Sequence, residues 1–224
     1  MKMLTGFGEA SGAQAPVMTL PSVTLLPQEL LPLYIFEPRY RRMLADVLET
    51  HRMFIVAMER PGSRGAPMAV AGLGLVRIGV QNPDGTSHLI LQGVSRVELT
   101  QTVQTKPYRI QRFRPLQAPS RDSVTIDALL AKVRDLVCER IELGLPPMFL
   151  PAKLKGKSKQ SIIAYLSNID DADKVADFVS WFLLRGPIER QTILETVEIE
   201  PRLKHLIHFL IAEITQHRNQ KKQS

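Results

Sequence analysis

Cysteine and tryptophan are scarce in this sequence, since each occurs once among 224 residues. The single cysteine, Cys138, excludes an intramolecular disulfide and any metal site that needs several cysteines. Disulfide-bonded proteins are concentrated in oxidising compartments, so one free thiol favours the reducing cytoplasm as the location. The hydrophobic content, 44%, is nonetheless ordinary for a globular protein.

Long apolar runs are also missing. A transmembrane helix needs about 20 consecutive apolar residues, and no run in the chain approaches that length. The first 15 residues hold one lysine, several glycines and no apolar core, unlike a secretory signal peptide. We therefore expect no association with membranes, and a disordered lead-in over residues 1–15.

Acidic residues are outnumbered by basic ones, 22 against 29, which gives a formal net charge of +7. A positive balance suggests nucleic acid as a partner. Much of the excess is local, however, because four lysines crowd residues 153–159 and three basic residues fall in the tail at 218–222. Basic and aromatic residues do not interleave as they do on platforms for single strands. Nucleic acid is therefore the less favoured partner.

The stretch from residue 31 to residue 49 predicts a strand that turns sharply into a helix. Apolar residues at 31, 33 and 35 alternate along the strand. Glu37 precedes a proline and is pushed away from helical geometry, whereas Pro38 fits the first helical turn. Apolar residues then recur at helical spacing, namely Tyr40, Met43, Leu44, Val47 and Leu48. We interpret residues 37–40 as fixing the turn, with Arg39 and Arg41 solvated.

Further extended segments are predicted at residues 17–25, 52–58, 69–80, 87–91, 94–103 and 108–116. The run 52–58 is continuously apolar, which predicts a strand buried on both faces. Gly72, Gly74 and Gly79 are expected to mark bulges or bends, and Gly93 to separate two strands. Residues 81–85 predict a tight turn. Six or so strands over roughly 100 residues predict a small closed or half-closed barrel.

Beyond residue 119 the period of the apolar residues changes from that of strands to that of helices. Helices are predicted from Asp122 or Ser123 to Leu143, over residues 161–166, from Asp170 or Asp171, from Gly186 through Glu195, and from near Pro201 onward. The fold class is therefore α+β. We expect a barrel with one packed helix over residues 16–119, a helical bundle over 120–217 and a basic tail over 218–224.

Two short motifs resemble nucleotide-binding sequences but lack residues that those sequences need. Gly156-Lys157-Ser158 resembles the end of a phosphate-binding loop, which requires a glycine where Pro151 stands. Gly72-Leu73-Gly74 resembles the start of a dinucleotide fingerprint, which requires a third glycine where Arg77 stands. We therefore predict no cofactor.

Residue types that often perform catalysis or bind metals are poorly placed. His205 and His208 fall opposite the apolar stripe of the last helix and lack a third metal ligand. Cys138 lies at the flank of its helix stripe, with no histidine predicted nearby to activate it. The four aspartates between residues 170 and 177 suit a helix N-terminus better than a cation. We predict no catalytic residue and no metal site, and a hydrolase is the least favoured alternative.

Several motifs, taken in order along the chain, resemble one family. The strand–turn–helix unit at residues 31–40 precedes barrel motifs at 71–78, 83–86 and 89–96, and helical motifs at 166–177, 191–196 and 200–203. Together they resemble the LON substrate-binding domain at the N-terminus of Lon proteases, over roughly residues 17–216. The resemblance implies a pseudo-barrel related to PUA-like domains, followed by a helical bundle.

The resemblance implies a non-enzymatic role, because Lon proteases carry their ATPase and Ser-Lys peptidase activities in modules that nothing here resembles. It implies binding of unfolded or degron-bearing polypeptides, or of a partner protein, in protein quality control or as a proteolysis adaptor. A PUA-like barrel that binds nucleic acid or a small molecule remains the alternative. We expect a monomer or a weak dimer.

Methionines supply the predicted recognition surface. Met-rich surfaces adapt to varied apolar partners. Met68 and the segment Met148-Phe149-Leu150 fall in predicted loops, where exposure is expected. We therefore predict Met68, Met148, Phe149 and Leu150 as polypeptide-binding residues, in a groove between the barrel and the helices.

Overall fold

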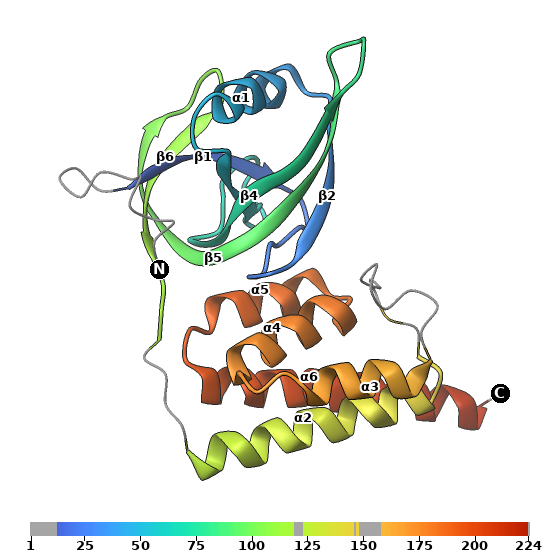
Figure 1. Ribbon diagram of the computed structural model, residues 1–224. Coiled ribbons are helices and arrows are strands. Elements are labelled where there is room, and N and C mark those ends of the chain that lie inside the picture. The colour runs from blue at the N-terminus through green and yellow to red at the C-terminus, as the bar shows by residue number, and fades with distance from the viewer. Residues whose placement is uncertain (1–12, 119–122, 146, 148–157, 224) are drawn as a thin grey trace. The chain divides into compact units, whose positions relative to one another are not determined.

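The computed structural model describes residues 13–118, 123–145, 147 and 158–223. The chain divides into two compact units, residues 1–117 (the N-terminal unit) and residues 118–224 (the C-terminal unit) (Figure 1). The described part of the first unit holds strands and one helix, and that of the second holds helices. The α+β class predicted from the sequence is confirmed.

The N-terminal unit is a partly closed barrel. Its elements are β1 (Gln14–Leu20), β2 (Leu30–Ile35), α1 (Pro38–Leu48), β3 (Met53–Met58), β4 (Val70–Gln81), β5 (Ser87–Gln104) and β6 (Arg109–Pro115). The strand order is β2-β5-β4-β3-β1-β6, and β5 also pairs with β6, so five strands form a closed ring. The pairing of β1 with β3 is parallel and the others are antiparallel. Strand β2 extends the sheet beyond this ring, along the first half of β5 (Figure 1).

Strand β5 corrects one prediction. We expected two strands separated at Gly93, but β5 is one continuous strand of 18 residues. Its first half pairs with β2 and its second half with β6, while β4 runs alongside both. A single long strand can therefore belong to both the open and the closed part of the sheet.

Glycines in β4 and β5 allow another segment to cross the sheet closely. Residues 21–29 (the crossing segment) follow β1, which ends at Leu20 rather than at the predicted residue 25. A Cβ atom on Gly72 would lie 2.0 Å from the carbonyl oxygen of Leu25, and one on Gly93 would lie 2.0 Å from that of Leu26. Any side chain larger than hydrogen would push the crossing segment off the sheet.

Bulges are found at some of the glycines where they were predicted and not at others. The register between β4 and β5 shifts between Leu73 and Gly74 and again between Val76 and Ile78. The first shift confirms the bulge expected near Gly74. Gly79 pairs with Leu89 in regular register, so the bend expected there was wrong.

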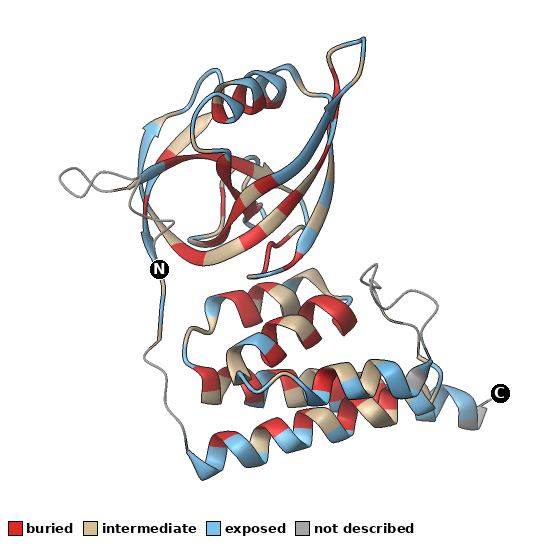
Figure 2. Ribbon diagram, viewed as in Figure 1, coloured by how far each residue is buried: buried red, intermediate tan, exposed pale blue. Residues whose placement is uncertain are grey.

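Two apolar clusters cover opposite faces of the central strands. Val17 and Ile55 belong to one cluster, whereas Met18, Phe54 and Val56 belong to the other. Every residue of β3 is buried, which confirms the strand predicted to be covered on both faces. The second cluster includes the apolar stripe of α1, so burial of that stripe holds the helix on the barrel (Figure 2).

Helix α1 begins as its sequence predicts. Glu37 has extended backbone angles, φ −65° and ψ 132°, and Pro38 occupies the first turn. Tyr40, Met43 and Val47 are buried on the barrel side. The predicted strand–turn–helix unit is therefore confirmed.

The described part of the C-terminal unit contains α2 (Val124–Glu142), α3 (Lys159–Ser167), α4 (Ala172–Leu183), α5 (Pro187–Glu195) and α6 (Ile199–Gln223). Ser123 caps α2 through its side chain and Asp171 caps α4, so the structure selects one of the two residues predicted for each helix start. Gly144, just past α2, has φ +75°, a conformation that favours glycine. None of the helices in the described ranges combines the length and apolarity needed to cross a bilayer.

Two buried arginines tie these helices together. Arg140 of α2 is fully buried and donates to both carboxylate oxygens of Glu213 in α6, at 2.8 and 2.9 Å. Arg202 of α6 is 2.7 Å from Asp173 and 3.6 Å from Asp177 of α4. The aspartate cluster is therefore structural, but two of its members bind Arg202 instead of capping the helix as predicted.

Candidate functional site

The predicted methionine surface falls largely outside the described residues. Met148, Phe149 and Leu150 belong to the part of the chain that the structure does not describe. Met68 is half-buried, and its amide donates to the carbonyl of Met58 at 2.8 Å. These four residues remain a prediction, and a second apolar surface lies within the described ranges.

That surface is one face of the open part of the sheet. Cross-strand pairing places Tyr34, His88 and Val80 in one row and Pro32, Ile90 and Ile78 in the next. Side chains directly opposite each other in a sheet share a face. The intervening residues, such as Leu89 and Leu91, point into the barrel cluster. We call the opposite side the exposed apolar face, made of Leu30, Pro32, Tyr34, Phe36, Ile78, Val80, His88 and Ile90.

Most of the exposed apolar face is accessible to solvent. Phe36, Ile78 and Val80 are 59%, 60% and 59% exposed, and Tyr34 is 49% exposed. Figure 2 shows the end of β4 toward the hairpin as exposed, where a strand with one polar face would carry polar side chains. Since an aromatic side chain offers about 150–250 Å², Tyr34 and Phe36 alone present roughly 200 Å² of surface.

Three rings lie in a row on this face. The centroids of Tyr34 and Phe36 are 5.8 Å apart, and those of Tyr34 and His88 are 4.7 Å apart. Both pairs are stacked, with interplanar angles of 28° and 27°. The stack holds the rings in place, which reduces the side-chain entropy lost when a ligand covers them.

The sequence itself carries a sign of this face in β2. Residues 31, 33 and 35 alternate with apolar residues at 34 and 36 and with Pro32, so β2 is apolar on both sides. A strand at the edge of a sheet has only one face to bury against the core. The second apolar face therefore needed another explanation.

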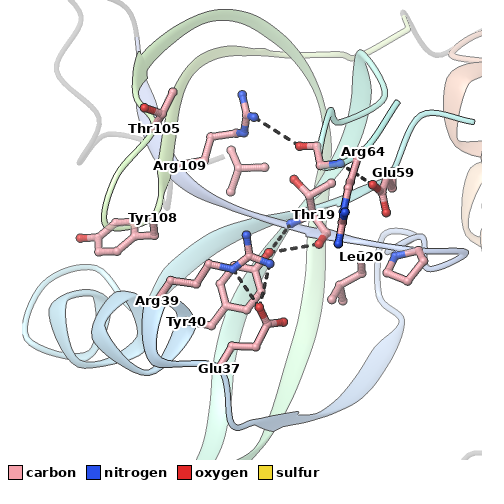
Figure 3. A pocket seen from close by; sticks show the side chains of 13 residues that line it. Thr19, Leu20, Glu37, Arg39, Tyr40, Glu59, Arg64, Thr105, Tyr108 and Arg109 are labelled. Carbon is pink, nitrogen blue, oxygen red and sulfur yellow. Dashed lines mark hydrogen bonds and ion pairs between the residues drawn. The ribbon is translucent and has the colours of Figure 1, made fainter. Parts of the chain in front are cut away.

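A pocket of about 440 Å³ lies on another part of the N-terminal unit (Figure 3). Its lining comes from four segments: the end of β1 with Thr19, the start of α1 with Arg39, the loop after β3 with Arg64, and the start of β6 with Arg109. Its volume lies in the range of small-ligand sites. Glu37, Arg39 and Tyr40, which the sequence placed only in a turn, thus also line this pocket.

Three guanidinium groups line the pocket and differ in their partners. Arg39 lies 2.7 Å from the carboxylate of Glu37, and its guanidinium carbon is 4.5 Å from the ring centre of Tyr40. Arg109 donates to the carbonyl oxygen of Gly65 at 3.2 Å. Arg64 is exposed and makes neither a hydrogen bond nor an ion pair within the described part of the chain.

Two tyrosines and a second glutamate complete the polar lining. The Tyr40 hydroxyl donates to the carbonyl of Thr19 at 3.1 Å and accepts from its amide at 3.2 Å. Burial raises the pKa of Tyr40, although Arg39 lowers it in part. The Tyr108 hydroxyl donates to Asp46 at 2.7 Å, and burial together with that carboxylate raises the pKa of Tyr108 to about 12. Both phenols are thus neutral near pH 7 and act as hydrogen-bonding groups.

The second glutamate, Glu59, accepts a hydrogen bond from the amide of Gly65. This bond fixes the loop that carries Arg64, because Gly65 also accepts from Arg109. The loop is therefore held from both sides at the rim of the pocket.

The chemical candidates weighed from the sequence do not come together. His205 and His208 are exposed on α6. Burial and the carboxylates of Asp135 and Glu142 raise the pKa of the Cys138 thiol, which disfavours a nucleophilic thiolate. Within the described ranges, no three histidine, cysteine or acidic side chains group as a metal site would require.

Relatives in sequence are Lon proteases. The Lon protease of Brucella abortus (biovar 1, strain 9-941) is 26% identical over 221 residues, which cover 96% of this chain and 26% of the relative. That of Phenylobacterium zucineum (strain HLK1) is 32% identical over 133 residues, covering 58% of this chain and 15% of the relative. The chain thus spans about a quarter of the length of the first of these relatives.

Solved structures with the same fold are Lon N-terminal domains. The N-terminal domain of the Mycobacterium avium complex Lon protease superposes with a TM-score of 0.68 at 16% identity, covering 88% of this chain and 97% of that one. The Lon N-terminal domain protein from Xanthomonas campestris gives 0.63 at 20% identity, covering 88% and 98%. The family model for the ATP-dependent protease La (LON) substrate-binding domain matches residues 14–212. The resemblance predicted from the motifs is confirmed, and the chain belongs to the LON substrate-binding domain family.

Proposed function

We propose that the protein is a non-enzymatic module that binds unfolded or degron-bearing polypeptides through the exposed apolar face. Two findings support the proposal, namely membership of a substrate-binding domain family and the presence of a solvent-accessible apolar face on β2, β5 and β4. The second is the observation that carries it. Monomeric proteins seldom expose contiguous apolar surface of several hundred Å² without an interaction role.

The chemistry of the face suits apolar segments of varied sequence. Its members are rings and branched aliphatic side chains, which gain from burial without demanding a particular hydrogen-bond pattern. Aromatic residues often supply the largest part of binding energy in protein interfaces. We therefore assign Tyr34 and Phe36 as the main contacts, with Ile78 and Val80 beside them. Met68, Met148, Phe149 and Leu150 remain proposed as additional contacts.

A role in protein quality control or as a proteolysis adaptor follows from this proposal. The relatives whose domain this chain matches are proteases, and a substrate-binding part suits delivery of polypeptides to such an enzyme. The expected state is a monomer or weak dimer in the cytoplasm. Nucleic acid is a weaker candidate, because the exposed face holds no arginine or lysine to contact phosphates.

The test is binding of fluorescein-labelled, reduced casein, measured by fluorescence anisotropy. The double variant Tyr34→Ser/Phe36→Ser removes both principal contacts, and Kd should rise at least tenfold, since a truncated hot-spot residue costs about 2 kcal/mol or more. Val103→Ser is the matched control, because Val103 is 50% exposed on β5 but lies outside the face. Equal affinities of the two variants would exclude the face as the binding surface.

A second measurement addresses the alternative functions. A labelled generic oligonucleotide is titrated at 50 and 200 mM salt under the same conditions. Salt-sensitive binding of the oligonucleotide without casein binding would replace polypeptide by nucleic acid as the partner. ATP turnover or casein cleavage by the pure protein would contradict the non-enzymatic assignment.

A further inference from the structure

The arginine-lined pocket has no part in binding apolar segments to the sheet face. Its lining contains both arginines and glutamates, but not every arginine forms an ion pair with a glutamate. Arg39 is matched by Glu37, whereas Glu59 accepts the Gly65 amide. Arg64 and Arg109 therefore line the pocket without a carboxylate partner in the part of the chain that the structure describes. Counting the five charged side chains of the lining, three are cationic and two anionic, so the pocket carries one net positive charge.

Hydrogen-bond capacity is also left over. A guanidinium group has five N–H donors. Arg109 uses one of them on the carbonyl of Gly65, and Arg64 uses none within the described ranges. Unused donors on two separate segments that line one cavity suit a planar anion that accepts several hydrogen bonds.

We propose that this pocket binds a carboxylate, and that its source is the free C-terminus of a polypeptide held by the protein. The inference rests on the proposed polypeptide binding. Arg64 and Arg109 hold the carboxylate, and Tyr40 and Thr19 form the floor between them (Figure 3). Val17, Leu20 and Pro21 give the last side chain an apolar wall.

The two glutamates favour a carboxylate over a phosphate. Glu37 and Glu59 lie in the same lining and leave it with one net positive charge, which a carboxylate neutralises and a phosphate of nearly two negative charges exceeds. Their oxygens can in turn accept hydrogen bonds from backbone amides of a peptide. A phosphate has no amide N–H groups to donate.

The walls favour a chain end over an internal acidic residue. Four segments surround the pocket, so a ligand enters from its open side. A C-terminal residue leaves one chain to exit by that side. With an internal aspartate or glutamate, the peptide continues on both sides of the residue. Both of these segments would have to pass through the same opening, or the side chain would have to be long enough to reach the arginines from outside.

The test is titration of N-acetyl-Ala-Ala and its C-terminal amide into the full chain, followed by NMR of the arginine Nε–Hε groups. The free acid should give saturable shifts of the Arg64 and Arg109 signals. The amide should bind at least tenfold more weakly, because it lacks the charge that strengthens these hydrogen bonds. Sodium acetate and sodium phosphate serve as small-anion comparisons and should also bind at least tenfold more weakly.

Arg64→Ala supplies the matching variant, with Arg60→Ala as its control. Both arginines are exposed and lie in the same loop, but only Arg64 lines the pocket. Arg64→Ala should weaken N-acetyl-Ala-Ala about tenfold, whereas Arg60→Ala should leave its Kd unchanged. Because Arg64 has no described partner, its loss should leave the fold intact.

Several results overturn the proposal. If the acid and the amide bind equally well, the pocket does not recognise a carboxylate. If acetate binds as tightly as the dipeptide, the pocket does not recognise a polypeptide chain end. Phosphate binding more tightly than either identifies a phosphate site instead. If Arg64→Ala and Arg60→Ala change the Kd of N-acetyl-Ala-Ala equally, the dipeptide is attracted by the general positive charge of the loop and not by the pocket.

This experiment and the casein experiment fail separately. A dipeptide is too short to need the exposed apolar face, so Tyr34→Ser/Phe36→Ser should bind N-acetyl-Ala-Ala with unchanged Kd. In this variant, loss of casein binding with retained dipeptide binding is the result that both proposals predict. Dipeptide binding without any casein binding by the unaltered protein overturns the proposed function and leaves the pocket as a site for a peptide carboxylate.

Discussion

Substitution of Gly72 tests how the crossing segment is held on the barrel. The Cβ of Gly72→Ala would lie 2.0 Å from the carbonyl oxygen of Leu25, a backbone atom that cannot rotate away. Carbon–oxygen contacts are normally about 3.3 Å or longer, so the strand or the segment must shift by roughly 1 Å. Leu25 and Leu26 are both fully buried, and such a shift disturbs their packing. Overpacking of this kind costs about 3 kcal/mol.

Gly79→Ala in the same strand is the control. A Cβ there would meet only a methyl group of Val76 at 3.9 Å, an ordinary contact. Replacing a strand glycine without a clash should stabilise the protein by about 0.5–1 kcal/mol. The two alanine variants should therefore differ by about 3.5–4 kcal/mol, a large part of a typical stability of about 5–15 kcal/mol.

The assay is urea unfolding followed by near-UV circular dichroism of the barrel tyrosines. With a slope of about 1–3 kcal/mol/M, the midpoint of Gly72→Ala should fall roughly 1–4 M below that of Gly79→Ala. Trp181 lies in α4 of the C-terminal unit, so its fluorescence reports that unit separately. Equal midpoints for the two variants would refute the close approach as the reason for glycine.

Three further predictions concern single contacts. Tyr108→Phe removes the hydrogen bond to Asp46 and should cost about 1 kcal/mol at pH 7. Because the folded pKa of Tyr108 is raised to about 12 from about 10 when unfolded, its contribution is complete below pH 10 and is lost as the pH rises toward 12. Urea midpoints from pH 8 to 11.5 should show this loss in the unaltered protein and not in the variant. Glu213→Gln leaves the buried Arg140 without its carboxylate and should cost about 3 kcal/mol by thermal or urea unfolding, and a change below 1 kcal/mol would contradict that role. Pro38→Gly loosens the first turn of α1 and should lower stability by about 1 kcal/mol while casein affinity stays the same; loss of affinity at unchanged stability would show that the turn has a direct role in binding.

The elements that follow local rules could be read from the sequence. Pro38 and the apolar spacing after it predicted α1. Two helix starts were predicted to within one residue, at 122 or 123 and at 170 or 171, and the structure places the caps at Ser123 and Asp171. The motifs in order along the chain indicated the LON family, which the family model confirms. These features depend on residues within a turn or two of one another.

Long-range contacts account for what was missed. Gly93 looked like a strand break, but it lies within β5 because the crossing segment, far away in sequence, needs the space. The pairing of Arg140 with Glu213 joins residues 73 apart. The residues next to Gly93 and Arg140 in the sequence do not indicate which distant residues these two contact.

The sequence by itself determined the change from strands to helices near residue 119, the start of α1 and the family. Only the tertiary structure decided where recognition can occur. The exposed apolar face exists because β2 pairs with β5 beyond the closed ring, which leaves Tyr34 and Phe36 uncovered. The pocket exists because closure of the barrel brings Arg39, Arg64 and Arg109 together. Side-chain pattern sets local conformation, whereas strand order and register set which distant side chains share one surface.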